Sequence, residues 1–173
     1  TMTKRLDSVN VISDENNRLL FRQTLFSSSS MKECIGGVIL YDETIRQKTS
    51  NGKTIPELIH SSGSLTGIKV DTGAKILAGS EKEKITEGLD GLRERLKDYY
   101  KLGARFTKWR GVYLINDKYP SDLAIVANAH ALARYAALAQ EAGMVPIIEP
   151  EILMNGNHSA KDCLNKTSEV IKK

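Results

Sequence analysis

Residues 104–110 read Ala-Arg-Phe-Thr-Lys-Trp-Arg, a short, partly apolar segment that ends in two charges separated by one residue. Residues 67–71 (Gly-Ile-Lys-Val-Asp) and 145–151 (Val-Pro-Ile-Ile-Glu-Pro-Glu) end in the same way. We call the last three residues of each segment, a charge, any residue and a second charge, a charge triplet. Side chains alternate between the two faces of a strand, so both charges of each triplet lie on one face. Three such pairs predict one polar site at the end of a sheet, which is where an α/β barrel has its active site.

The rest of the chain alternates strand and helix patterns. Continuous apolar runs of strand length are typical of a parallel sheet that is buried on both faces. The expected strands are residues 35–41, 66–71, 104–110 (or 104–113) and 144–149, and the expected helices are 14–26, 44–48, 54–61, 85–102, 121–142 and 160–173. This order predicts an α/β fold with right-handed crossovers. The strands are spaced about 40 residues apart and an eight-stranded barrel takes about 250 residues, so four strands predict a partial (β/α)8 TIM barrel in a single domain, residues 1–173.

Composition limits the classes of function. The chain has 173 residues, 40% of them hydrophobic and 27% charged, as in an ordinary globular protein. Its net charge of +4 favours an anionic ligand such as a sugar phosphate. The lack of Lys/Arg-rich runs argues against a nucleic-acid-binding protein. No apolar stretch is long enough for a membrane span. Cys34 and Cys163 lack metal-ligand spacing, which predicts two reduced, partly buried thiols in a cytoplasmic protein. The first residues read like the middle of an element and the last lie inside a helical pattern, so we expect an excerpt of a longer chain.

The charges of the first two triplets allow two interpretations. Lys69 and Asp71 either pair and fill a barrel interior, or Lys69 binds a phosphate or hydroxyl group with its compact ammonium charge. Lys108 and Arg110 are two cations on one face of a buried strand, and they repel each other unless anions or an anionic ligand lie opposite. The second pair therefore predicts carboxylates or a bound anion nearby.

The third triplet supplies such carboxylates. Glu149 and Glu151 lie on one face, and close carboxylates push their pKa values apart, so that one can stay protonated as a general acid. Alternatively each pairs with one of the cations, because the six charges of the triplets sum to zero. Trp109 faces the other side of its strand and is expected to pack under helices. Structural roles are expected for the three histidines, His60, His130 and His158, which fall on helix or loop segments.

In and around these triplets the chain resembles class I fructose-bisphosphate aldolases. The matching segments are residues 15–23, 36–40, 67–71, 88–92, 108–110, 132–136 and 145–153, in an order and spacing that hold along nearly the whole chain. The resemblance implies a (β/α)8 barrel, usually a homotetramer, that needs no metal ion or other cofactor. The implied reaction is the glycolytic, reversible cleavage of fructose 1,6-bisphosphate to dihydroxyacetone phosphate and glyceraldehyde 3-phosphate through a lysine Schiff base.

The resemblance also assigns roles to residues. Glu149 resembles the acid/base of carbinolamine dehydration and carbon–carbon cleavage, Lys108 the charged lysine that assists Schiff-base formation, and Glu151 a carboxylate that supports this network. The implied substrate-binding residues are Lys69, Arg110, Asp71 and Arg5. Of these, Arg5 resembles an arginine at a phosphate subsite. Thr107 stands where the family commonly has alanine, a difference expected to be peripheral.

Two parts of the family's active site have no counterpart in the sequence. The strand-one segment with a catalytic aspartate is expected before Thr1, and the Schiff-base lysine, on strand six, beyond Lys173. One hypothesis is that the parent protein is a glycolytic class I aldolase with strands two to five in this chain. The alternative is a catalytically inactive fragment that keeps sugar-phosphate binding or assembly contacts. On either hypothesis the isolated chain is expected to lack aldolase activity, because it lacks the nucleophile.

Overall fold

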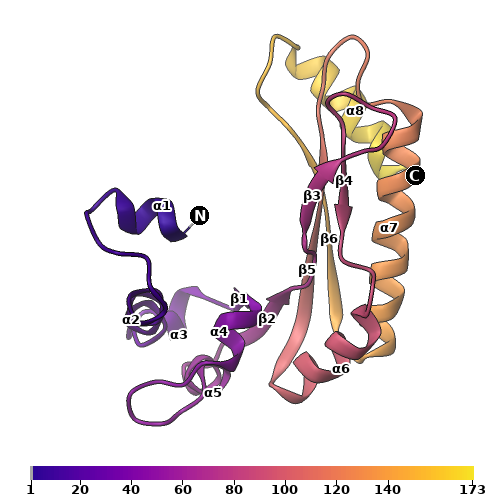
Figure 1. The fold of residues 1–173 in the computed structure, drawn as a ribbon. Coiled ribbons are helices and arrows are strands. Elements are labelled where there is room, and N and C mark those ends of the chain that lie inside the picture. The colour runs from indigo at the N-terminus through magenta and orange to yellow at the C-terminus, as the bar shows by residue number, and fades with distance from the viewer. Residues whose placement is uncertain (1) are drawn as a thin grey trace.

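The computed structural model describes residues 2–173, which alternate between helices and strands (Figure 1). The helices are α1 (Met2–Asp7), α2 (Glu15–Phe26), α3 (Met31–Cys34), α4 (Asp42–Arg46), α5 (Ile55–Ser61), α6 (Leu92–Lys101), α7 (Asp122–Glu141) and α8 (Ala160–Ile171). The strands are β1 (Gly37–Leu40), β2 (Leu65–Lys69), β3 (Gly73–Ile76), β4 (Lys84–Glu87), β5 (Ala104–Tyr113) and β6 (Val145–Ile152). All four predicted main strands are present, and β5 has the longer of the two predicted lengths, ending at Tyr113.

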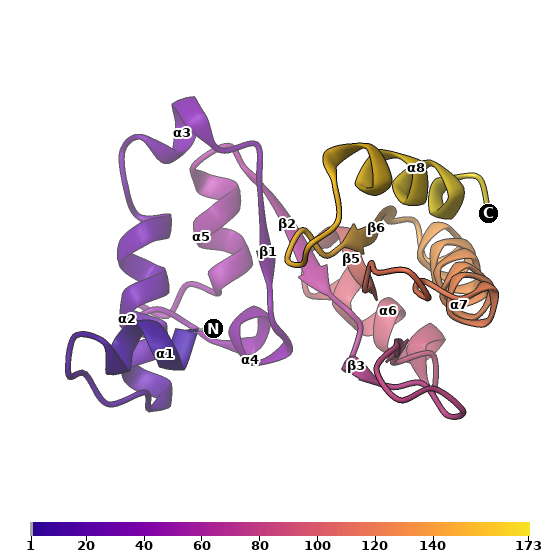
Figure 2. The same cartoon turned by 90° about the horizontal axis from the view of Figure 1, so that it is seen from above.

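Four strands form one parallel sheet in the order β1-β2-β5-β6. Helix α5 packs on β2, α6 packs on β5, α7 packs on both β5 and β6, and α8 packs on β6. Seen from above, α2, α3 and α5 lie on one side of β1, and α6 to α8 gather around β5 and β6 (Figure 2). Parallel strands that alternate with helices in this way make up half of a (β/α)8 barrel, as predicted.

The core lies between the sheet and its helices. Side chains that leave the strands on this side, such as Ile68 and Trp109, are fully buried against Leu92, Leu96 and Tyr135 of the helices. The predicted position of Trp109 under the helices is confirmed, and its ring stacks on Tyr135 with centroids 5.4 Å apart.

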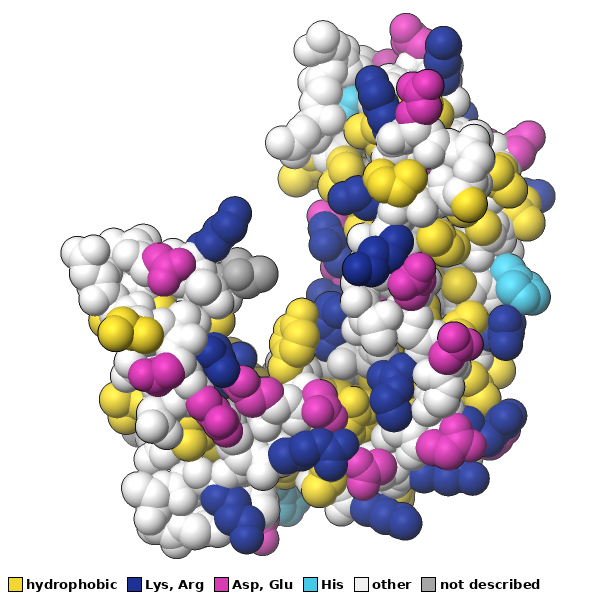
Figure 3. Space-filling model, viewed as in Figure 1, with side chains coloured by type: hydrophobic (Ala, Val, Ile, Leu, Met, Phe, Trp, Pro, Cys, Tyr) yellow, Lys and Arg dark blue, Asp and Glu magenta, His cyan; other side chains and the backbone are white. Residues whose placement is uncertain are grey.

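The opposite face of the sheet is open. Apolar side chains of alternate strand residues, Ile39, Leu65, Val145 and Ile147, are exposed there. Figure 3 shows a hollow between the part that holds α1 and α2 and the part that holds β5 and β6, with Lys and Arg side chains gathered on its wall.

The predicted helix 85–102 is wrong in its first half. Residues 73–87 form an antiparallel hairpin of β3 and β4, and the helix α6 begins only at Leu92. Gly88 explains the break: its φ is +130°, and a Cβ on it would lie 2.9 Å from the Thr72 backbone nitrogen. Leu89 and Leu92 have helical spacing with Leu96, but the backbone at Gly88 and at Gly91, with φ +62°, is left-handed and cannot belong to a helix.

The predicted environment of one cysteine is also wrong. Cys34, at the end of α3, is exposed, whereas Cys163 on α8 is partly buried as expected, and both are free thiols. Cys34 is exposed because α3 is a single turn at the rim of the structure, where only Met31 reaches the core.

Candidate active site

The three charge triplets meet on the open face of the sheet, where β2, β5 and β6 end. Lys69 of β2 lies directly opposite Lys108 of β5, and Arg110 of β5 lies directly opposite Glu149 of β6. The prediction that these side chains share one polar site is therefore consistent with the register. Strand pairing alone brings together residues that are about 40 positions apart in sequence, since neighbouring parallel strands lie ~4.8 Å apart.

The cations of β5 pair with the carboxylates of β6. Lys108 Nζ lies 2.6 Å from Glu149 Oε2, and the Arg110 guanidinium pairs with Glu151. Both pairs are diagonal, because Lys108 lies opposite Ile147 in the register and each cation contacts the carboxylate two residues further along β6 than its direct partner. Opposed carboxylates thus offset the repulsion between the two cations, which is one of the two arrangements that the sequence left open.

The Lys108–Glu149 contact differs from the Arg110–Glu151 contact in geometry. Glu149 Oε2 is enclosed but makes no well-aligned hydrogen bond within residues 2–173, so its contact with Lys108 is mainly ionic. Arg110 Nε donates a hydrogen bond to Glu151, which holds the pKa of Glu151 below its ordinary value and raises that of Arg110. Glu151 is therefore ionised near neutral pH and does not serve as the protonated member of a carboxyl pair.

Asp71 ties the first triplet to the rest of the site. It is 8% exposed, and its carboxylate pairs with the Lys69 ammonium. It also accepts hydrogen bonds from the backbone N–H groups of Gly73, at 3.1 Å, and Arg110, at 3.4 Å. A carboxylate held from three sides by β2, the hairpin and β5 has little freedom to move, so Asp71 positions Lys69 and the backbone of Arg110.

The covered face of the sheet fixes the backbone beneath the site. The hydroxyls of Thr107 and Tyr135 lie 2.7 Å apart, and the Tyr135 hydroxyl donates to the Ile147 carbonyl of β6 at 3.2 Å. Burial raises the pKa of Tyr135 to about 12, so this hydroxyl stays protonated and keeps donating. Thr107, expected to be peripheral, is fully buried and links β5, α7 and β6.

The β3–β4 hairpin, which the sequence did not predict, also supports the site. The Thr86 hydroxyl donates to the Arg110 carbonyl at 2.7 Å, and the Thr86 N–H donates to Asn128 of α7 at 3.3 Å. The backbone that carries Arg110 is therefore held by the hairpin on one side and by β6 on the other.

Two residues remain to be placed. Arg5 lies on the exposed surface of α1, and no hydrogen bond or ion pair among residues 2–173 joins its side chain to the triplets, so its role at a phosphate subsite stays a prediction. Sequence reasoning missed Tyr41, whose ring lies 5.3 Å from Lys69 Nζ. Tyr41 directly follows the apolar residues of β1, just as the charge triplets follow the apolar residues of their strands. This shared position could have identified Tyr41 from the sequence.

Among residues 2–173, no cluster of three or more His, Cys, Asp or Glu side chains is arranged to hold a metal ion. The helices of this described part are also too short or too polar to cross a lipid bilayer.

Comparison with known proteins identifies the family. A family model described as glycolytic, fructose-bisphosphate aldolase class-I, matches residues 1–173. A probable class 1 fructose-bisphosphate aldolase of Xanthomonas axonopodis is 49% identical over 172 residues, which cover 99% of this chain and 52% of the relative. Mouse fructose-bisphosphate aldolase C is 51% identical over 172 residues, which cover 99% of this chain and 47% of the relative.

A solved structure supports the same conclusion. The fructose-bisphosphate aldolase of Plasmodium falciparum, crystallised with TRAP and a small-molecule inhibitor, superposes with a TM-score of 0.96 at 43% sequence identity and covers 99% of this chain and 50% of its own. The chain thus spans about half the length of the relatives it matches. With the family model matched over all 173 residues and the fold shared with a solved aldolase, the chain belongs to the class I fructose-bisphosphate aldolase family.

Proposed function

We propose that the protein containing this chain is a glycolytic aldolase that reversibly cleaves fructose 1,6-bisphosphate to dihydroxyacetone phosphate and glyceraldehyde 3-phosphate through a lysine Schiff base. The observation that carries the proposal is the set of three ion pairs at the strand ends, because they combine cations for an anionic substrate with carboxylates for proton transfer. The family assignment supports the same reaction. Residues 1–173 would be strands two to five of one barrel domain.

In this proposal Glu149 is the proton-transfer group. Its carboxylate contacts Lys108 at 2.6 Å without a well-aligned hydrogen bond, so it has lone pairs free to accept a proton from a substrate hydroxyl. Cleavage of the carbon–carbon bond needs a base at the hydroxyl next to that bond, and the same group returns the proton in the reverse direction. Lys108 pairs with the Glu149 carboxylate between these steps and assists formation of the Schiff base.

The other charged residues contact the substrate or orient the residues that contact it. Lys69 and Arg110 are the cations proposed to contact phosphate or hydroxyl groups, since an ammonium suits a single oxygen and a guanidinium binds two. Glu151 orients the Arg110 guanidinium through their hydrogen bond. Asp71 orients Lys69 and lies at the edge of the substrate site, and Arg5 would reach a phosphate group from α1.

A second candidate is a sugar-phosphate-binding or assembly module without catalysis. The open apolar face of the sheet, with Ile39, Leu65, Val145 and Ile147 exposed, supports assembly with further polypeptide. The sequence of these 173 residues also contains no segment like the family's Schiff-base lysine segment. A protein limited to this chain is therefore proposed to bind sugar phosphate without turnover.

Further properties of the whole protein are proposed on the same basis. We propose a homotetramer in the cytosol, and an Arabidopsis thaliana relative that is 49% identical over 171 residues is named as cytosolic. Small sugar phosphates are the proposed partners, rather than nucleic acid or membrane.

The decisive experiment is borohydride trapping of the protein encoded by the full gene. Incubation with dihydroxyacetone phosphate and borohydride is expected to give a stable adduct, detected by mass spectrometry as the added mass of the reduced ketose phosphate on one lysine. An intact protein without an adduct would contradict the Schiff-base mechanism. In parallel, the 173-residue chain is expected to show no cleavage of fructose 1,6-bisphosphate, and measurable turnover by this chain would contradict the proposed need for the missing lysine.

A further inference from the structure

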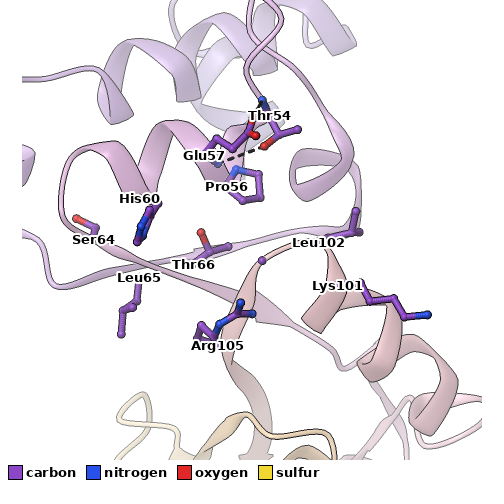
Figure 4. Close-up of a pocket in the computed structure, with 11 residues that line it drawn as sticks. Thr54, Pro56, Glu57, His60, Ser64, Leu65, Thr66, Lys101, Leu102 and Arg105 are labelled. Carbon is purple, nitrogen blue, oxygen red and sulfur yellow. Dashed lines mark hydrogen bonds between the residues drawn. The ribbon is translucent and has the colours of Figure 1, made fainter.

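A second polar cavity lies at the other end of the strands. It has a volume of about 470 Å³ and lies between α5 and the turn that joins α6 to β5 (Figure 4). Its residues come from the beginnings of β2 and β5, whereas the ion pairs lie at the ends of these strands. Arg105 in the cavity precedes Arg110 of the candidate active site by five residues, about 16 Å along an extended strand. The two sites are therefore separate.

The cavity has rigid walls. Thr54 and Glu57 form a capping box that fixes the first turn of α5, with Pro56 at the start of the helix. Gly103, in the turn before β5, has φ +107°, and a Cβ on it would lie 3.1 Å from Pro56 Cβ. The turn approaches α5 this closely because residue 103 has no side chain, and the space beside this contact is the cavity.

A threonine of β2 lines the cavity. Thr66 is only 4% exposed, and none of the hydrogen bonds formed within residues 2–173 uses its hydroxyl. The hydroxyl oxygen is not among the fully enclosed polar atoms that lack a partner, so it is open to the cavity. Figure 4 shows it pointing toward α5, with His60 beside it and Arg105 lower in the view. Thr66 can therefore exchange a hydrogen bond with water or a ligand in the cavity.

The charged groups around Thr66 favour an anion. Arg105 Nη1 donates to the carbonyls of Tyr100 and Ala104 at 3.0 and 2.7 Å, and the guanidinium lies over the Tyr100 ring at 4.4 Å. These contacts hold the guanidinium in place, and no other group in the described part of the chain takes a hydrogen bond from its Nε or Nη2. Lys101 also lines the cavity, but its ammonium points away from Thr66 and Arg105 (Figure 4).

The single carboxylate among the lining residues does not compete for these donors. Glu57 already accepts the backbone N–H of Thr54 at 2.7 Å, in the capping box. The lining therefore offers an anion a guanidinium, an imidazole and a hydroxyl, against one carboxylate that is engaged elsewhere.

We propose that this cavity binds the oxyanion group of a small metabolite, a phosphate or a carboxylate, through Arg105, Thr66 and His60. The Arg105 guanidinium donates two hydrogen bonds to two oxygens of the anion. The Thr66 hydroxyl donates to the anion from β2, and the His60 imidazole contacts it from α5. Pro56 and Leu102 provide an apolar wall for the rest of the ligand. The proposal does not depend on the proposed catalytic function, because no residue of the ion pairs takes part.

The test is a titration of the isotope-labelled chain, in which its amide resonances are monitored by NMR. One arm uses inorganic phosphate, a second uses acetate, and the control uses chloride at matched ionic strength. Saturable shifts at Thr66, Gly103 and Arg105 in the phosphate or acetate arm are expected. The arm that saturates identifies the kind of oxyanion. Shifts confined to Lys69, Lys108 and Arg110, or none beyond those in chloride, would overturn the proposal.

Three variants assign the binding to the cavity. Arg105→Gln is expected to weaken binding about tenfold or more, since it removes a charge-assisted contact. Thr66→Val keeps the volume and is expected to weaken binding about threefold, and it carries the test if the arginine variant does not fold. Lys161→Gln, on the exposed surface of α8, removes the same charge and is expected to bind as the original chain does. Equal affinity of the Thr66 and Arg105 variants and the original chain would refute the site.

Discussion

The ion-pair cluster around Glu43 makes a strong prediction about acid stability. Arg18 binds the Glu43 carboxylate through two nitrogens, Nε at 3.0 Å and Nη2 at 2.5 Å, and Arg22 Nη1 adds a third contact at 2.8 Å. The hydrogen bond from Arg18 is the main reason that the pKa of Glu43 falls from 4.5 to about 2. The cluster joins α2 to α4, so its loss loosens the packing of α2.

The magnitude follows from this pKa. A pKa of about 2 against 4.5 corresponds to about 3 kcal/mol of stabilisation at neutral pH, at about 1.4 kcal/mol per unit. Because the Glu43 side chain is 35% exposed, solvent screening reduces this, and we expect Glu43→Gln to lower the free energy of unfolding by about 1–2 kcal/mol at pH 7. A lowered pKa stabilises the folded state above about pH 4.5, and the stabilisation is lost as the pH falls through 2. The difference between the two proteins should therefore shrink between pH 5 and pH 2.

The assay is urea unfolding of both proteins at pH 7, 5, 4 and 3. Glu141→Gln is the matched control, because Glu141 pairs with Arg93 but both side chains are 52% exposed, and its effect should be much smaller than that of Glu43→Gln. A Glu43→Gln protein as stable as the original at pH 7, or a stability difference that stays constant down to pH 3, would refute the assigned role of the cluster.

Three further changes test the fold and the site. Gly88→Ala should lower the free energy of unfolding by about 1–3 kcal/mol in urea titrations, because Gly88 has a positive φ and a Cβ there would contact the Thr72 backbone. The control Gly36→Ala has open space around the new Cβ and should change the free energy of unfolding little. Equal effects of the two changes would contradict the account of the hairpin. Thr107→Ala should cost about 1–2 kcal/mol of unfolding free energy, because it removes the hydrogen bond to Tyr135, and an unchanged unfolding midpoint would show that this bond is dispensable. In the protein encoded by the full gene, Glu149→Gln should lower kcat for fructose 1,6-bisphosphate by about 10²–10⁴-fold with a smaller change in KM, and an unchanged kcat would exclude Glu149 as the acid/base.

The main elements of the fold could be predicted because each has a strong local pattern. The strands are apolar runs of the right length, and the helices α2, α5, α7 and α8 begin at side-chain caps that the sequence displays as Asp14, Thr54, Ser121 and Ser159. The hairpin could not be predicted in this way. Leucines at helical spacing follow it, and the φ of Gly88 depends on how closely the chain passes Thr72, which is a tertiary contact.

The gathering of the charged side chains on one face could be predicted, but their pairings could not. Alternation places the two charges of a triplet on one face, whatever the neighbouring strand does. Which carboxylate each cation contacts depends on the register between β5 and β6 and on the diagonal reach of Lys108 and Arg110. The contacts of Asp71 with the hairpin were beyond reach for the same reason, because the hairpin itself was not predicted.

The diagonal pairs of β5 and β6 give the cations of this site built-in counterions. Lys108 and Arg110 have the carboxylates of Glu149 and Glu151 as partners, and the strand that carries each carboxylate keeps it beside its cation. In the proposed function, an anionic substrate would therefore share Arg110 with Glu151 rather than meet an unpaired guanidinium. The two ion pairs would also keep the charges of the site balanced while no substrate is bound.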